Sequence, residues 1–311
     1  MITLTFVYWV AGLTFSAFAY LSARDRSNPQ RFGNAAFWLL IAISMFAGDY
    51  LGDLGNGMLV IALVAIAGFG QIGRGTSNSE PAERAAKAEK HGNRLFLLAL
   101  VIPAVALLGT LVFTEIPDWI DSKQVTLISL TMGVILALAI GYLWLRPKPV
   151  TPLEEGRRLM DSVGWAAVLP QMLASLGAVF ALAGVGDVVG GLMSQVIPDG
   201  SLIGAVIAFG LGMALFTMIM GNAFAAFPVM ASAIALPLLI GTHNGNPAIV
   251  CAIGMLAGFC GTLMTPMAAN FNIVPAALLE LKDRNAVVKA QIGTAVPLLI
   301  VNIALIYWLA F

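Results

Sequence analysis

Two short polar segments interrupt the apolar C-terminal third of the chain, and their residue types could bind an ion or a small anion. Amide, hydroxyl and carbonyl oxygens are suitable donors for Na⁺, while free N–H groups at the start of a helix attract a carboxylate. We predict a site for a substrate and an ion at these positions: Gly221, Asn222 and Ala223 in the first segment, and Gly261, Thr262, Thr265, Pro266 and Asn270 in the second.

The same segments predict broken helices. Each lies inside an apolar stretch longer than the roughly 20 residues that one straight membrane span needs. Backbone outside a regular helix is tolerated at membrane depth only where protein buries it or where it lines a cavity, and in transporters such breaks point to the binding site. The oxygens of Asn222, Thr265 and Asn270 are then the candidate Na⁺ ligands. The alternative is that Gly, Thr and Pro serve helix packing alone.

Composition predicts an all-α polytopic membrane protein. The chain is 59% hydrophobic and 10% charged, and it has a net charge of zero. No basic patch with interleaved aromatic residues is present that could bind nucleic acid. Residues 1–23 lack a basic region before the apolar run, so we expect a retained first helix rather than a cleaved signal peptide.

Charge asymmetry predicts the topology. Basic connections follow the first, third and fifth apolar runs, and acidic connections follow the second and fourth. Because basic loops stay in the cytoplasm, the N-terminus is expected outside the cytoplasmic (inner) membrane of a bacterium. The six runs lie at about 3–22, 34–51, 56–72, 95–113, 125–145 and 162–184.

The remainder of the chain needs an odd number of crossings, because acidic residues at 187–199 are expected outside and basic residues at 282–289 inside. We predict that 201–240 forms a re-entrant hairpin that turns at Gly221 and Asn222. Residues 248–281 then form one span broken between Gly261 and Asn270. With the last helix this gives about eight crossings and places both termini outside.

The chain is expected to divide near residue 150. Residues 1–150 form a membrane scaffold of five helices, and residues 151–311 form the transport half. The polar segment that begins at Thr151 is expected to be an interfacial connector. Asp49 and Asp53, four residues apart, could relay protons on one helical face or lie in the headgroup region.

Neither an enzyme nor a transition-metal site is expected. Cys251 and Cys260 lie in apolar sequence and have no His or second Cys at zinc-ligand spacing. The spans also lack the Ser/His, paired Asp or His-Glu-x-x-His arrangements that hydrolysis inside a membrane needs. We expect no cofactor other than Na⁺ or H⁺ as a coupling ion.

The segments around Asn222 and Thr265 resemble the second half of the ion transporter superfamily, which includes dicarboxylate and citrate carriers. More specifically, the chain over its whole length, and particularly in segments 221–228 and 260–279, is similar to a bacterial membrane family identified as one subunit of a two-component 5-oxoproline transporter. The superfamily carries Ser-Asn-Thr at the hairpin tip, where Asn and hydroxyls hold Na⁺ and a carboxylate. This chain has Gly221, Asn222 and Ala223 there, so both hydroxyls are missing.

The resemblance implies an elevator-type secondary transporter of a small carboxylate, with 5-oxoproline as the substrate. It also implies a partner, a second and smaller membrane subunit, in the same lipid bilayer. Residues 1–150 contain no matching hairpin and break, which agrees with a transporter whose other half is a separate polypeptide. Two alternatives stay open: a structural subunit that stabilises a partner transporter, and an intramembrane enzyme.

Overall fold

The computed structural model describes residues 2–75, 81–116, 119–121, 123–198 and 200–311. Over these residues the chain is helical apart from turns, loops and one isolated bridge between Ile2 and Ile120. Seven of the described helices are long and apolar enough to cross a membrane, and a further apolar helix, Pro247–Leu263, is shorter. The predicted all-α polytopic membrane fold is therefore confirmed.

The chain forms two compact units, residues 1–164 and 165–311, which we name unit 1 and unit 2. The helices of unit 1 are α1 (Leu4–Arg24), α2 (Arg31–Gly68), α3 (Pro81–His91), η1 (Gly92–Arg94), α4 (Leu95–Thr114), α5 (Val125–Leu145) and α6 (Thr151–Val163). Because α6 packs against α1, the division falls after α6 rather than near residue 150, where the sequence places it.

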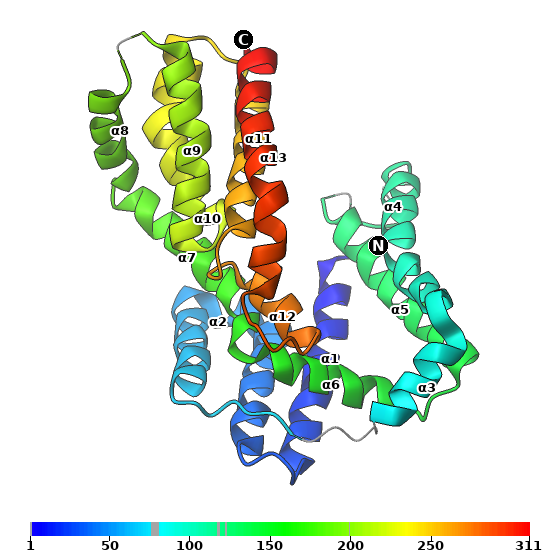
Figure 1. Ribbon diagram of the computed structural model, residues 1–311. Coiled ribbons are helices and arrows are strands. Elements are labelled where there is room, and N and C mark those ends of the chain that lie inside the picture. The colour runs from blue at the N-terminus through cyan, green and yellow to red at the C-terminus, as the bar shows by residue number, and fades with distance from the viewer. Residues whose placement is uncertain (1, 76–80, 117–118, 122, 199) are drawn as a thin grey trace. The chain divides into compact units, whose positions relative to one another are not determined.

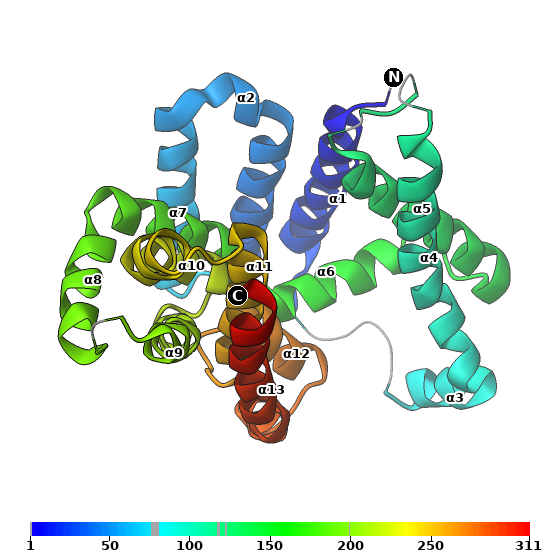
Figure 2. The ribbon, with the colours of Figure 1, turned by 90° about the horizontal axis from the view of Figure 1, so that it is seen from above.

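Within unit 1, α2 turns back on itself. A straight helix of its 38 residues would be about 57 Å long. Its two ends nevertheless meet, because Asn34 and Gly73 exchange two hydrogen bonds of 2.8 and 2.9 Å. The break is at Gly52, whose φ of 62° and ψ of −177° are not helical. Figure 2 shows the two arms of α2, which correspond to the predicted spans 34–51 and 56–72.

The turn of α2 satisfies its own backbone. Asn56 Nδ2 donates to the carbonyl oxygens of Gly48 and Gly52, at 2.8 and 3.0 Å. A break in a helix releases such carbonyls, and an amide side chain one turn later can replace the lost donors. The two acids of this turn, Asp49 and Asp53, are exposed.

A buried ion cluster fastens α6 to the other end of α1 and α2. Arg157 Nη1 binds Asp25 Oδ2 at 2.9 Å and Asp161 Oδ2 at 3.1 Å, and Trp38 Nε1 donates to Asp161 Oδ1 at 2.8 Å. Burial raises the pKa of the Asp161 carboxyl above its ordinary value, against the hydrogen bonds from Trp38 and Asn34 that lower it. The connector predicted at Thr151 is thus held by unit 1.

The helices of unit 2 are η2 (Gly164–Ala167, which begins at the boundary), α7 (Leu169–Leu182), α8 (Val185–Val196), α9 (Leu202–Met220), α10 (Ala223–Met230), η3 (Ala231–Thr242), α11 (Pro247–Leu263), η4 (Ala269–Ile273), α12 (Val274–Leu278) and α13 (Ala286–Ala310). Within unit 2, α9, α11 and α13 pack side by side (Figure 1). Their core includes Phe209, Met213, Ile234 and Leu239.

The segment 201–240, predicted as a re-entrant hairpin, consists of α9 followed by α10 and η3, and its re-entrance into the membrane stays a prediction. After the turn, the chain returns as one apolar helix, Ala223–Thr242, in which Pro228 and Pro237 lie inside. Residues 231–242 form wide π-helical turns, which accommodate a helix whose prolines remove backbone donors. Both arms are long enough to cross a membrane.

The predicted span 162–184 is wrong in its bounds. Its helix, α7, has only 14 residues, or about 21 Å, and a left-handed residue, Gly184, joins it to α8. Gly177 packs against Ala225 of α10, and Gly190 packs against Ala233 of η3. The bent pair α7 and α8 therefore runs parallel to α10 and η3, with small residues allowing close backbone contact.

Candidate functional site

The two predicted breaks contact each other in unit 2. Gly221 ends α9 in the left-handed conformation, with φ at 74°. A Cβ atom at this position would lie 2.5 Å from the carbonyl oxygen of Met267 and 3.0 Å from its Cβ. Only glycine fits such a conformation and such a close approach. The structure thus brings the first segment, at Gly221, against the second segment, at Met267.

Thr265 ties the second break to the end of α9. Its Oγ1 donates to the Met218 carbonyl at 2.9 Å and accepts from the Met267 N–H at 3.2 Å. The Met218 carbonyl belongs to the last turn of α9, where helix carbonyls have no helical donor. Thr265 is 4% exposed. Its hydroxyl therefore serves as a link between the two breaks.

Asn272 holds the backbone that the second break releases. Its Nδ2 donates to the carbonyl oxygens of Thr262 and Thr265, at 2.8 and 2.6 Å, just where α11 ends. The side chain is buried, and its Oδ1 has no hydrogen-bond partner among the described residues. Asn272 was not among the predicted site residues. Its spacing of two residues from Asn270 was the available signal.

Thr217, near the end of α9 at the first break, contributes a second unpartnered oxygen. Its Oγ1 is buried and has no hydrogen-bond partner among the described residues. It lies in the last turn of α9, and Gly221 N donates to the Thr217 carbonyl at 2.7 Å. A Cβ on Gly258 of α11 would lie 3.3 Å from Thr217 Oγ1. The hydroxyl therefore lies where α9 crosses α11, and Thr217 was not among the predicted site residues either.

The unpartnered oxygens of Thr217 and Asn272 indicate a place where a ligand could bind. A buried oxygen that makes no hydrogen bond costs about 1–3 kcal/mol relative to one that is satisfied. Thr217 Oγ1 and the lone pairs of Asn272 Oδ1 are hard oxygen donors beside backbone carbonyls. Such donors suit an alkali cation, a water molecule or a polar group of a ligand.

Asn222 caps the returning arm of the hairpin. Its Oδ1 accepts from the Phe224 N–H at 2.8 Å, and its backbone is extended. This is the geometry of a helix N-cap, which satisfies one of the free N–H groups of α10. Asn222 is half-buried, whereas Ala223 beside it is 1% exposed and contacts the Gly258 position. Part of the amide of Asn222 is therefore committed to the fold.

The other predicted site residues have separate roles. Gly261 packs against the Ala214 backbone, where a Cβ would collide. Thr262 Oγ1 donates to the Phe259 carbonyl at 2.6 Å, within its own helix. Pro266 is exposed in the turn. The side chain of Asn270 lies outside the described residues, so its predicted role as a ligand stays a prediction.

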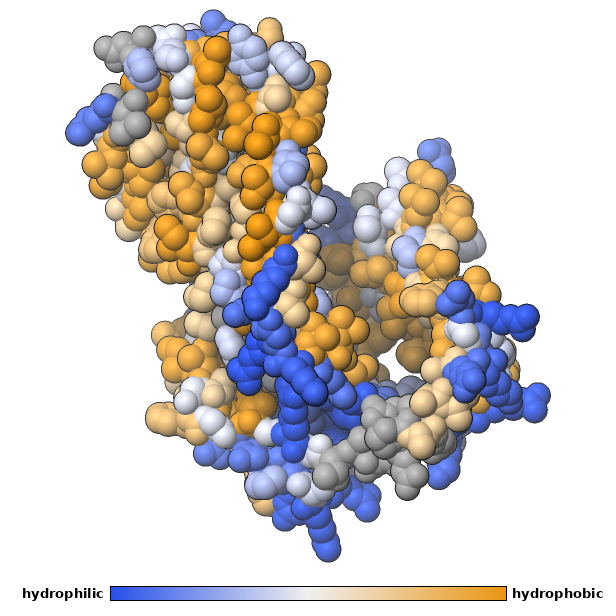
Figure 3. All heavy atoms as spheres, in the orientation of Figure 1, coloured by the Kyte–Doolittle hydropathy of each residue, from blue (hydrophilic) through white to orange (hydrophobic). Residues whose placement is uncertain are grey.

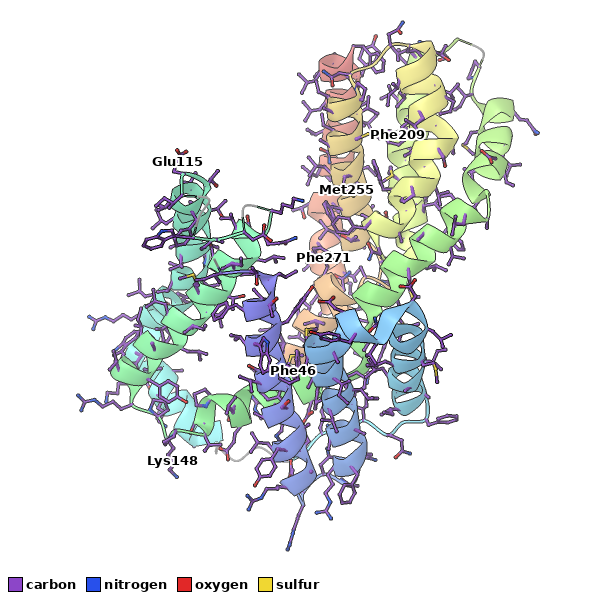
Figure 4. The ribbon with its side chains drawn as sticks, turned by 180° about the vertical axis from the view of Figure 1, so that it is seen from behind. Phe46, Glu115, Lys148, Phe209, Met255 and Phe271 are labelled. Carbon is purple, nitrogen blue, oxygen red and sulfur yellow. The ribbon has the colours of Figure 1, made fainter. Side chains whose placement is uncertain are left out.

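Aromatic side chains line one side of the breaks. The ring of Phe259 lies 5.7 Å from that of Phe224 and 6.3 Å from that of Phe271, between ring centroids. Phe224 and Phe271 are partly exposed, at 60% and 41%. Figure 4 labels Phe271 beyond Met255 and Phe209 in unit 2. The breaks thus combine backbone polar groups with an apolar aromatic wall.

The breaks lie part-way along α13 and not at its end. Asn246 N donates to the Ala310 carbonyl at 3.0 Å, and Asn302 Nδ2 contacts Cys260 Sγ at 3.4 Å, so α13 runs antiparallel to α11. The first dozen residues of α13, about 18 Å of helix, therefore extend past the end of α11. There α12 packs against them. This arrangement fits a span broken within its length.

The part of the predicted span 248–281 that follows the break is shorter than predicted. It consists of η4 and α12, which together end at Leu278. After the break the chain therefore forms a π-helical turn that begins at Ala269, not a long helix. Asp187, one of the acidic residues expected outside, is exposed in the first turn of α8, beside the bend that joins α7 to α8.

Fold and composition together define a polytopic helical membrane protein whose second unit contains two helix breaks in contact. The chain belongs to a family of proteins of unknown function, DUF979, whose family model matches residues 5–311. No curated protein matches the chain, and no solved structure matches it. The family carries no assigned activity, so neither a substrate nor a coupling ion follows from membership.

Proposed function

We propose that this protein is a subunit of a secondary active transporter for a small organic anion, with 5-oxoproline as the substrate. The observation that carries the proposal is the contact between the two breaks in unit 2. There Thr265 bonds to Met218 of the other segment, and two buried oxygens have no partner among the described residues. In transporters, interrupted helices of this kind supply backbone and side-chain groups to a ligand.

The chemistry of the junction suits a small carboxylate with an apolar ring. The N-terminal turn of α10 follows Asn222 and presents N–H groups and the positive end of a helix dipole. The rings of Phe224, Phe259 and Phe271 offer an apolar surface beside it. No Arg or Lys occurs between residues 159 and 281, so the backbone is the available source of positive potential in this stretch.

The oxygens favour Na⁺ over a proton as the coupling ion. Residues 217–222 and 261–272 contain no acidic or histidine side chain that could take up a proton. Thr217 Oγ1 and Asn272 Oδ1 are buried, neutral donors of the kind that an alkali cation binds. We place this transporter in the bacterial inner membrane with both termini outside, and we assign the missing half of the transport machinery to a second, smaller membrane subunit.

Uptake of labelled 5-oxoproline into proteoliposomes tests the proposal. The chain should be reconstituted with and without the membrane protein encoded beside it, under a Na⁺ gradient, a proton gradient or neither. We expect accumulation that needs both subunits and the Na⁺ gradient. Unchanged accumulation after both gradients are removed would exclude secondary active transport.

Site variants separate this proposal from a purely structural role. Thr217→Val keeps the shape of the side chain and removes the oxygen. It should raise the Na⁺ concentration needed for half-maximal uptake while the subunits still co-purify. Ser129→Ala, which removes a buried hydroxyl of unit 1, is the matched control and should transport normally. If Thr217→Val transports like the parent, Thr217 does not contribute to the site.

A further inference from the structure

Unit 1 carries a basic surface that is independent of the helix breaks. It is formed by Lys90, Arg94, Arg146 and Lys148, which we call the basic corner. All four residues are exposed. They come from two parts of the chain, one at the end of α3 and the start of α4, and the other just after α5. None of the four forms an ion pair with a carboxylate among the described residues.

Tertiary contacts bring these two parts together. The ring of His91, which ends α3, lies 5.6 Å from that of Trp144 in the last turn of α5, between centroids and nearly edge-on. The start of α4 also contacts the end of α5, since the Gly141 position lies 3.8 Å from Leu98. The two stretches that carry the four cations therefore lie side by side.

The loop after α5 is folded in a defined way. Arg146 takes the left-handed conformation, with φ at 46°, and its N–H donates to the Tyr142 carbonyl at 3.1 Å. The Tyr142 hydroxyl in turn donates to the Pro149 carbonyl at 2.5 Å. The loop thus folds back over the last turn of α5, which fixes the positions from which Arg146 and Lys148 extend.

Apolar side chains adjoin the cations on the membrane side. Phe96, Leu97 and Leu143 are exposed at 68%, 59% and 79%, one turn or less from the charged residues along α4 and α5. Figure 3 shows hydrophilic side chains gathered at this end of unit 1, next to the apolar sides of the helices. Figure 4 labels Lys148 at the same end.

We propose that the basic corner binds the headgroup of an anionic phospholipid, with its acyl chains against Phe96, Leu97 and Leu143. A phosphate diester offers charge and acceptor oxygens to Lys and Arg, while Trp144 and Tyr142 have the amphipathic rings that occur at the headgroup level. Basic clusters directly beside membrane helices recognise anionic lipids in this way. Glu89 is the acid next to Lys90, and it leaves the cations in excess.

The test uses the full chain in mild detergent, with phosphatidylglycerol or phosphatidylcholine of identical acyl chains added. Native mass spectrometry measures bound lipid, and thermal unfolding measures stabilisation. We expect selective retention of phosphatidylglycerol and a higher unfolding midpoint, both weakened by added salt. Equal binding of the two lipids would overturn the proposal. Inorganic phosphate and glycerol 3-phosphate serve as soluble probes, and equal protection by either would assign the corner to a soluble anion instead.

Variants locate the binding. Lys90→Gln, Arg94→Gln, Arg146→Gln and Lys148→Gln should each lower affinity for phosphatidylglycerol about fivefold, the effect of one charge near a membrane surface. Lys148→Arg should retain binding. Arg26→Gln removes an exposed charge elsewhere in unit 1 and is the matched control. If the control loses as much as the corner variants, binding is nonspecific and the proposed site is wrong. Unfolding in phosphatidylcholine alone checks that each variant folds.

Discussion

The helix breaks of the two units differ in how the polar groups beside them are hydrogen-bonded. In unit 1, the break at Gly52 is exposed, and Asn56 Nδ2 donates to the carbonyls of Gly48 and Gly52. At the break after Leu263 in unit 2, Thr265 and Asn272 are buried. Asn272 donates to two carbonyls, while its own Oδ1 has no partner among the described residues. A turn that only reverses the chain can have all of its polar groups hydrogen-bonded within the protein. A turn that binds a ligand has to leave some of them available.

The two units also differ in whether charged side chains lie in their interior. Unit 1 pairs Arg157 with two carboxylates in its interior, which fastens α6 to α1 and α2. The breaks of unit 2 contain neutral polar groups only. Neutral groups lose less on burial than ions do, so they can be kept partly unsatisfied at a binding site. Under the transport proposal, unit 1 is the scaffold and unit 2 binds the ligand.

The largest effect is expected for Arg157→Met. The substitution leaves buried Asp161 and half-buried Asp25 without their cation, and removal of one partner from a buried pair costs about 3–5 kcal/mol. Chemical denaturation in detergent should show this loss. The double variant Arg157→Met with Asp161→Asn should regain part of it. A loss below about 1 kcal/mol would mean that this cluster does not fasten α6.

The next effect is expected for Gly221→Ala. Its left-handed conformation costs an alanine about 1–2 kcal/mol, and overlap with the Met267 backbone adds about 1–3 kcal/mol. Gly184→Ala is the matched control, because Gly184 has nearly the same φ, 67°, and a Cβ there would lie 3.5 Å from its nearest neighbour, Asp187. Equal thermal destabilisation of the two variants would show that the breaks are not packed as described.

A smaller effect is expected for Asn272→Leu, compared with Asn56→Leu. Each variant loses two hydrogen bonds to carbonyls released by a break. The buried site should lose about 1–3 kcal/mol, and the more exposed one less, because water replaces the amide there. Unfolding midpoints give the comparison. In the uptake assay only Asn272→Leu should lose activity, and equal loss in both variants would remove the functional distinction between the two breaks.

The smallest effect on stability is expected for Thr217→Val. Removal of a buried hydroxyl that has no partner should leave the free energy of unfolding within about 1 kcal/mol of the parent, or raise it slightly. Ser129→Ala in unit 1 should behave alike. The two should differ in Na⁺-dependent protection from thermal unfolding, which Thr217→Val alone is expected to lose. Identical protection in both variants would place the cation elsewhere.

Part of this arrangement was predictable from local sequence. The apolar runs located most of the spans, and the Gly and Pro positions located the turn at Gly221 and the end of α11 near Gly261. The span at 162–184 was misplaced because its apolar run continues past Gly184. Hydropathy does not register the left-handed bend that divides it into α7 and α8. The sequence pattern also did not predict that α6 belongs to unit 1, because Asp25, the carboxylate that binds Arg157 of α6, lies far away in the sequence.

For the site, the sequence determined which segments interrupt their helices, because glycine, proline and small polar residues act on the backbone next to them. Tertiary structure decided which polar atoms are used. Thr265 and Asn222 looked like ligands, yet contacts and caps engage their oxygens. Thr217 and Asn272 looked ordinary, yet burial leaves an oxygen of each without a partner. Hydrogen-bond satisfaction depends on groups brought together from distant positions, so no local pattern of residues encodes it.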